Sequence, residues 1–96
     1  REAVERIKEN YQPQKIILFG SVSRGEMTAE SDIDLLIIKE TDKRLVDRVE
    51  EVLSMLPPHI PIEPHVLTPK EVEERLQKED LFLKTILNQG KVLYAL

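Results

Sequence analysis

Two apolar segments with a strong preference for β-structure constrain the fold more than any other feature of this chain. Residues 15–19 form a continuous run of Lys-Ile-Ile-Leu-Phe that ends at Gly20, and residues 33–38 are apolar on both faces after their first turn. A strand that is apolar on both faces needs cover on both sides. The second segment is therefore predicted to be a central strand of a sheet that lies between helices.

Segments with apolar residues at helical spacing surround these strands, at residues 1–11, 42–56, 69–76 and 81–87. Pro13 ends the first of them. Thr68 is predicted to cap the third helix, with Pro69 in its first turn and Glu71 completing a capping box. Gly90 follows the last helix and is expected to be a left-handed cap residue. Ser21 is expected to cap a further short helix after the first strand.

Residues 60–67 alternate between apolar and polar side chains, which is typical of a half-exposed strand. Pro61 and Pro64 cannot donate hydrogen bonds to a neighbouring strand, so this strand is predicted at the edge of the sheet. Residues 92–94 are predicted to add a short final strand. The fold class is therefore α/β (α+β), a small mixed sheet flanked by helices, and the 96 residues are expected to form a single domain.

Composition excludes several classes of function. The net charge of −4 disfavours strong nucleic-acid binding, which depends on clustered Lys and Arg. The chain has no cysteine, which removes disulfides and thiolate chemistry. No apolar run approaches the length of a membrane helix. A cytoplasmic protein without membrane contact is expected.

Asp32 and Asp34 are the strongest candidates for chemistry, because residues two apart on a strand point to the same face. Paired carboxylates can share the cations of a two-metal phosphoryl-transfer site. The same pattern is also common in ordinary turns. Its position at the beginning of a strand disfavours phosphatase and receiver folds, whose sites follow the carboxyl ends of strands.

Gly20 and Ser21 form a second candidate site where the first strand ends. Backbone amides at such a turn can bind phosphate oxygens, and Arg24 lies close enough in the sequence to reach a phosphate. Each feature alone is equally consistent with a turn, a helix cap and a surface arginine.

The two features together are more specific. Residues 19–25, Phe-Gly-Ser-Val-Ser-Arg-Gly, followed by residues 31–35, Ser-Asp-Ile-Asp-Leu, closely resemble the signature of the DNA polymerase beta-like nucleotidyltransferase superfamily, in its minimal nucleotidyltransferase branch. The resemblance implies the nucleotidyltransferase fold. It also implies that the triphosphate is bound by Gly20, Ser21, Arg24 and Gly25, and that two Mg²⁺ ions are bound by Asp32 and Asp34.

The family also uses a third carboxylate from the next strand, and Glu63 occupies that position. By resemblance, Asp32, Asp34 and Glu63 are the expected catalytic and metal-binding residues. Three carboxylates without a cation repel one another, and oxygen ligands near phosphate favour Mg²⁺, with Mn²⁺ as a substitute. His65 faces the same way as Glu63; it is either a surface histidine or an aid to proton transfer.

The expected reaction is transfer of a nucleoside monophosphate, AMP from ATP, to a hydroxyl group. The resemblance implies a helical HEPN-domain partner protein, a toxin that this chain would modify as its antitoxin. One alternative is a nucleotide-binding or antitoxin subunit that acts by partner binding without useful catalysis. Another is a small-molecule nucleotidyltransferase. A homo-oligomer is compatible with each of these.

Overall fold

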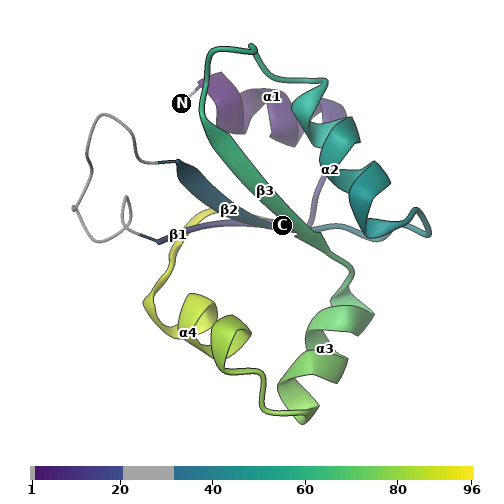
Figure 1. Cartoon of the computed structure of the whole chain (residues 1–96), viewed down its shortest axis with the longest axis vertical. Coiled ribbons are helices and arrows are strands. Elements are labelled where there is room, and N and C mark those ends of the chain that lie inside the picture. The colour runs from purple at the N-terminus through teal and green to yellow at the C-terminus, as the bar shows by residue number, and fades with distance from the viewer. Residues whose placement is uncertain (1, 21–31) are drawn as a thin grey trace.

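The computed structural model describes residues 2–20 and 32–96, which build a four-stranded sheet with helices on both sides (Figure 1). The short helix predicted after Ser21 lies outside the described residues. In chain order, the described elements are α1 (Glu2–Tyr11), β1 (Lys15–Phe19), β2 (Ile33–Ile38), α2 (Leu45–Leu53), β3 (Ile62–Leu67), α3 (Pro69–Gln77), α4 (Leu81–Gln89) and β4 (Lys91–Ala95).

The sheet has the strand order β3-β2-β1-β4. β1 runs antiparallel to both β2 and β4, whereas β2 and β3 are parallel. The predicted mixed sheet, the central position of β2 and the edge position of β3 are therefore confirmed. The register places Asp34 of β2 between Phe19 of β1 and Glu63 of β3.

Alternating side chains of the strands build two separate hydrophobic layers. In Figure 1, α1 and α2 lie on one side of the sheet, and α3 and α4 lie on the other. The buried residues on the first side are Ile7, Tyr11, Ile16, Leu18, Leu35, Ile37, Val52, Leu56, Ile62 and Val66. Those on the second side are Ile17, Leu36, Ile38, Leu67, Leu83 and Ile86. Because successive strand residues point to opposite faces, Asp34, Glu63 and Phe19 belong to the α3/α4 side.

The start of α3 has the predicted capping box. The Thr68 hydroxyl accepts a hydrogen bond from the backbone N–H of Glu71 at 3.1 Å, and the Glu71 carboxylate accepts one from the N–H of Thr68 at 2.9 Å. Two otherwise unpaired backbone donors are thereby satisfied. The Thr-Pro-Lys-Glu sequence fixes the point at which β3 gives way to helix.

The Glu71 carboxylate also binds Arg48 of α2, whose side chain is only 7% exposed. The guanidinium donates to both carboxylate oxygens, at 2.8 and 3.1 Å, and to the carbonyl oxygens of Lys43 and Val66. The hydrogen bond from Arg48 is the main cause that lowers the pKa of Glu71. One buried cation thus connects α2, β3 and α3.

Helix α2 is shorter than the predicted segment of residues 42–56. Its N-cap residue, Arg44, has an extended backbone with φ −68° and ψ 158°, so the helix begins after it. Beyond Leu53, the N–H groups of Met55 and Leu56 donate to carbonyls three residues back instead of four. Such tight turns are common at helix ends, and apolar spacing does not distinguish them from helix.

The predicted left-handed conformation of Gly90 is wrong. Gly90 does cap α4, but its φ is −73° and its ψ is 162°, which any residue can adopt. The reason for glycine is space, because a Cβ atom here would lie 2.6 Å from Cγ2 of Ile17. α4 and β4 each extend slightly beyond the predicted residues. Within residues 2–20 and 32–96, no helix is both long and apolar enough to cross a membrane.

Candidate functional site

Two neighbouring parallel strands bring the candidate acidic residues together. Asp34 is the second residue of β2 and Glu63 the second residue of β3, and the two are paired in register. His65 follows two residues later on β3 and therefore shares the face of Glu63. The site thus lies on the α3/α4 side of the sheet, where β2 and β3 begin and β1 ends.

The three side chains form a compact group of possible metal ligands. One ligand atom each from Asp34, Glu63 and His65 lies within 4.8 Å of the other two. Nε2 of His65 is 3.9 Å from Oδ1 of Asp34 and 3.9 Å from Oε2 of Glu63. Carboxylate and imidazole groups at such separations have the right chemistry to hold a divalent cation.

Burial and neighbouring charges raise the pKa of Asp34 above the ordinary value of 3.8 for aspartate. Desolvation is the largest cause, followed by the negative charge of Glu63. His65 acts in the opposite direction, and Asp32 adds a smaller repulsion. A cation bound here would remove this repulsion, as expected for a site built to bind positive charge.

Asp32 lies just before β2 and is exposed. Its charge acts on Asp34, but it is not part of the compact group with Glu63 and His65. The structure therefore brings together two of the three predicted carboxylates with a histidine. A metal-binding role for Asp32 stays a prediction.

Gly20 is placed directly against Asp34. Its φ of +83° lies in the left-handed region, where side chains are strained, and an added Cβ would collide with Oδ2 of Asp34. The other predicted nucleotide-binding residues, Ser21, Arg24 and Gly25, lie outside the described residues. The carboxylate of Asp34 consequently has one oxygen toward Gly20 and the other toward His65.

His65 is the site residue that the sequence left open. Its ring packs against those of Phe19 and Phe82, with centroid distances of 5.3 and 5.9 Å, and the two phenylalanines contact each other edge to face at 5.7 Å. The sequence signal that pointed to His65 was its position two residues after Glu63 on the same predicted strand, which places both side chains on one face. The approach of Phe82 from α4 has no counterpart in the local sequence pattern.

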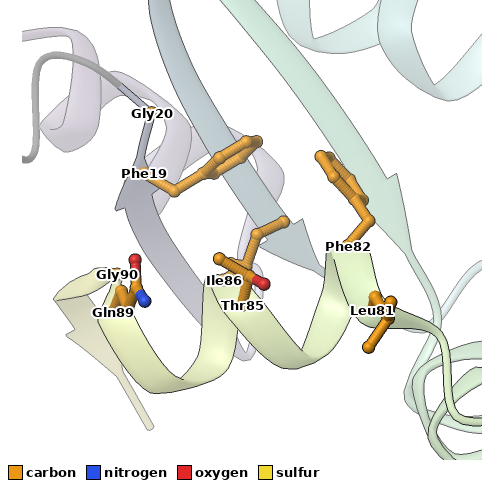
Figure 2. A pocket seen from close by; sticks show the side chains of 8 residues that line it. All are labelled: Phe19, Gly20, Leu81, Phe82, Thr85, Ile86, Gln89 and Gly90. Carbon is orange, nitrogen blue, oxygen red and sulfur yellow. The ribbon is translucent and has the colours of Figure 1, made fainter.

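An open pocket of about 360 Å³ lies beside this aromatic cluster. Figure 2 shows the rings of Phe19 and Phe82 next to each other over α4, with Gly20 at one end of the pocket. Thr85 and Gln89 add polar groups to a mostly apolar lining. Pockets of this size can accept a small organic molecule.

Comparisons with known proteins identify the family that this chain resembles. A protein of Methanocaldococcus jannaschii named "Putative protein adenylyltransferase MJ0604" is 36% identical over 98 residues, which cover 98% of this chain and 93% of that protein. A Sulfolobus solfataricus crystal structure described as a "putative nucleotidyltransferase" matches with a TM-score of 0.60 and 25% identity, over 76% of this chain and 67% of that one.

A solved toxin-antitoxin structure with AMP-PNP has the same fold, with a TM-score of 0.62 and 20% identity over 97% of this chain and 70% of that one. The family model described as the nucleotidyltransferase domain matches residues 1–92. A match over nearly the whole sequence, together with the observed mixed sheet, means that this chain belongs to the nucleotidyltransferase domain family.

Proposed function

We propose that this chain transfers AMP from ATP to a hydroxyl group on a partner protein. The observation that carries the proposal is the meeting of the Asp34 and Glu63 carboxylates beside the Gly20 turn. The Methanocaldococcus jannaschii relative, named "Putative protein adenylyltransferase MJ0604", supports protein as the acceptor. The AMP-PNP in the toxin-antitoxin structure supports ATP as the donor.

In this proposal, Asp32, Asp34 and Glu63 hold two divalent ions, Mg²⁺ or Mn²⁺, and Gly20 binds the triphosphate with Ser21, Arg24 and Gly25. The oxygen donors of the carboxylates suit these ions. The apolar pocket of Phe19 and Phe82 beside Gly20 is large enough for the base. An aromatic wall next to a phosphate-binding turn fits the two ends of a nucleotide.

The reaction forms a bond between the acceptor oxygen and the α-phosphorus of ATP, and breaks the bond between that phosphorus and the bridging oxygen of the β-phosphate. Pyrophosphate leaves, and the hydroxyl proton passes to a carboxylate of the site. Bound divalent ions supply charge stabilisation for the attacking and departing oxygens. The protein contributes the positions of the carboxylates and the turn that orients the triphosphate.

A helical HEPN-domain toxin is the partner that we propose, with this chain as its antitoxin. The fold similarity to a toxin-antitoxin structure supports a paired system. The reaction uses ATP, so we propose a cytoplasmic location, with which the cysteine-free sequence is compatible.

The proposal is tested with α-labelled ATP, divalent metal and the protein encoded beside this gene. Label should pass to the partner with the unmodified chain and with Asp42→Asn, a control on the exposed loop before α2. Asp34→Asn should abolish the transfer. Retention of full transfer by Asp34→Asn would remove this site from the reaction.

A second function is kept open by Glu63, whose side chain is 57% exposed. Glutamate is one methylene longer than the aspartate that the family usually has at this position, which favours a subunit that binds nucleotide and partner without turnover. In that case the chain would bind ATP and neutralise the partner, but no label would transfer to the partner. The Asp34→Asn variant would still neutralise the partner.

A further inference from the structure

The candidate metal group differs from an all-carboxylate site by one nitrogen donor. Mg²⁺ strongly prefers oxygen ligands and retains its waters. Imidazole is a better ligand for first-row transition metals, whose affinities for nitrogen and oxygen sites rise from Mn²⁺ onward. His65 therefore bears on which ion the site selects.

The separations between His65 and each carboxylate are short enough for one ion to bridge the imidazole and that carboxylate. Two ligands about 2.1 Å from an ion are at most about 4.2 Å apart. The separations of 3.9 Å from Nε2 of His65 to Oδ1 of Asp34 and to Oε2 of Glu63 lie within this limit. They are too long for hydrogen bonds, so a direct proton-mediated contact does not account for the arrangement.

The ring of His65 is also held in place before any ion binds. Phe19 and Phe82 pack against it from β1 and α4, and the side chain is only 34% exposed. A ligand whose orientation is fixed by packing loses little freedom on binding. This packing comes from residues on the α3/α4 side of the sheet and does not involve the carboxylates of Asp34 and Glu63.

We propose that His65 is a metal ligand which, with Asp34 and Glu63, makes one ion position of this site selective for Mn²⁺ over Mg²⁺. The inference deepens the proposed function, because the ion would be one that serves nucleotide transfer. Waters and nucleotide phosphates can complete a six-coordinate shell around Mn²⁺. The selectivity proposed here is for Mn²⁺ over Mg²⁺ only, because three protein ligands and a water also suit Zn²⁺.

The chain offers a matched control, because it has two histidines and the other, His59, is exposed in the turn before β3. Mn²⁺ binding to the nucleotide-free protein is followed by electron paramagnetic resonance, with Mg²⁺ as competitor. His65→Ala should weaken Mn²⁺ binding by about tenfold to a hundredfold, a range seen for groups that support metal sites. Mg²⁺ affinity should change little, and His59→Ala should behave like the unmodified chain.

A second measurement detects the metal–nitrogen bond without relying on the variant. Pulsed electron paramagnetic resonance of the Mn²⁺ complex should show coupling to a directly bound ¹⁴N nucleus. Labelling the histidines with ¹⁵N should change this coupling, and it should persist in His59→Ala. Absence of nitrogen coupling in the unmodified chain, or equal Mn²⁺ affinity in a folded His65→Ala variant, would overturn the inference.

These results are separable from the proposed reaction. Nucleotide transfer that depends on Asp34 but shows no nitrogen coupling would refute the metal assignment and leave the reaction standing. Nitrogen coupling and Mn²⁺ selectivity without any transfer to the partner would support the metal assignment and refute the proposed reaction.

Discussion

At the residue scale, Gly20 and Asp34 depend on each other. Gly20 has a positive φ, and its missing side chain leaves the room that one oxygen of Asp34 occupies. The sequence motif predicted a turn at Gly20 and a carboxylate at Asp34, but strand pairing is what brings them into contact. Motif residues far apart in sequence are adjacent because β1 and β2 are antiparallel neighbours.

Gly20→Ala should therefore damage the candidate metal site as well as the fold. We expect a loss of about 1–2 kcal/mol in stability from the left-handed backbone alone. Displacement of Asp34 should also reduce metal affinity, measured by titration with Mn²⁺. Gly90→Ala is the control: its Cβ would press on Ile17, so it should lower stability while metal affinity stays unchanged.

Asp34→Asn should stabilise the metal-free protein at neutral pH. Burial and Glu63 raise the pKa of Asp34, so its ionised form costs stability once the pH exceeds the ordinary value of 3.8. This cost grows as the pH rises through the raised pKa and is absent in acid, where aspartate is protonated in both states. Denaturant unfolding should show a gain on the order of 0.5–2 kcal/mol near pH 7, the range of typical stabilising changes.

The same comparison near pH 3 should show no gain from Asp34→Asn. Asp42→Asn, which alters an exposed loop residue, should leave stability nearly unchanged at both pH values. A neutral-pH loss of stability in metal-free Asp34→Asn would contradict the view that this carboxylate is strained without a cation.

At the element scale, features that are set by local chemistry could be predicted from the sequence, whereas features that depend on tertiary contacts could not. The cap at Thr68 and the edge strand with Pro64 follow from local chemistry, and both are confirmed. The predicted strand start at residue 60 is two residues early, because β3 begins at Ile62, after Pro61. The ends of α2 and the backbone of Gly90 depend on neighbouring elements, and these predictions failed. The proximity of His65 to Phe82 likewise arises only when α4 packs on the sheet.

The junction of α2, β3 and α3 should be the most sensitive polar contact outside the site. Glu71→Ala removes both the capping bond and the carboxylate partner of buried Arg48. We expect a loss of about 2–4 kcal/mol, between the cost of a cap and that of a broken buried pair. Thermal or denaturant unfolding would measure it, and exposed Glu73→Ala on the same helix should cost little.

Lowering the pH gives an independent check on this junction. The pKa of Glu71 is depressed by Arg48, so the pair stabilises the fold above the ordinary pKa of 4.5 and is lost as the pH falls through the depressed value. The stability difference between the unmodified chain and Glu71→Ala should therefore narrow in acid. A difference independent of pH would mean that packing, not charge, holds the junction.

At the scale of the whole molecule, metal binding at the candidate site would be linked to the stability of the fold. An ion that binds only the folded chain stabilises it by about 2.7 kcal/mol at a hundred times its dissociation constant. Mn²⁺ should accordingly raise the melting temperature of the unmodified chain, followed by circular dichroism. Asp34→Asn should show a much smaller rise, although its metal-free form starts from a higher melting temperature.

The sheet lies between two hydrophobic layers, and this arrangement also has a practical consequence. Among the described residues, the side chains of the site lie on the α3/α4 side, whereas Glu9 and Glu50 are exposed on α1 and α2, the helices that cover the opposite side. The sequence has no thiol. Glu9→Cys or Glu50→Cys would thus create a unique attachment point for a surface or a dye, and the immobilised protein would still present its metal-facing side to a large partner.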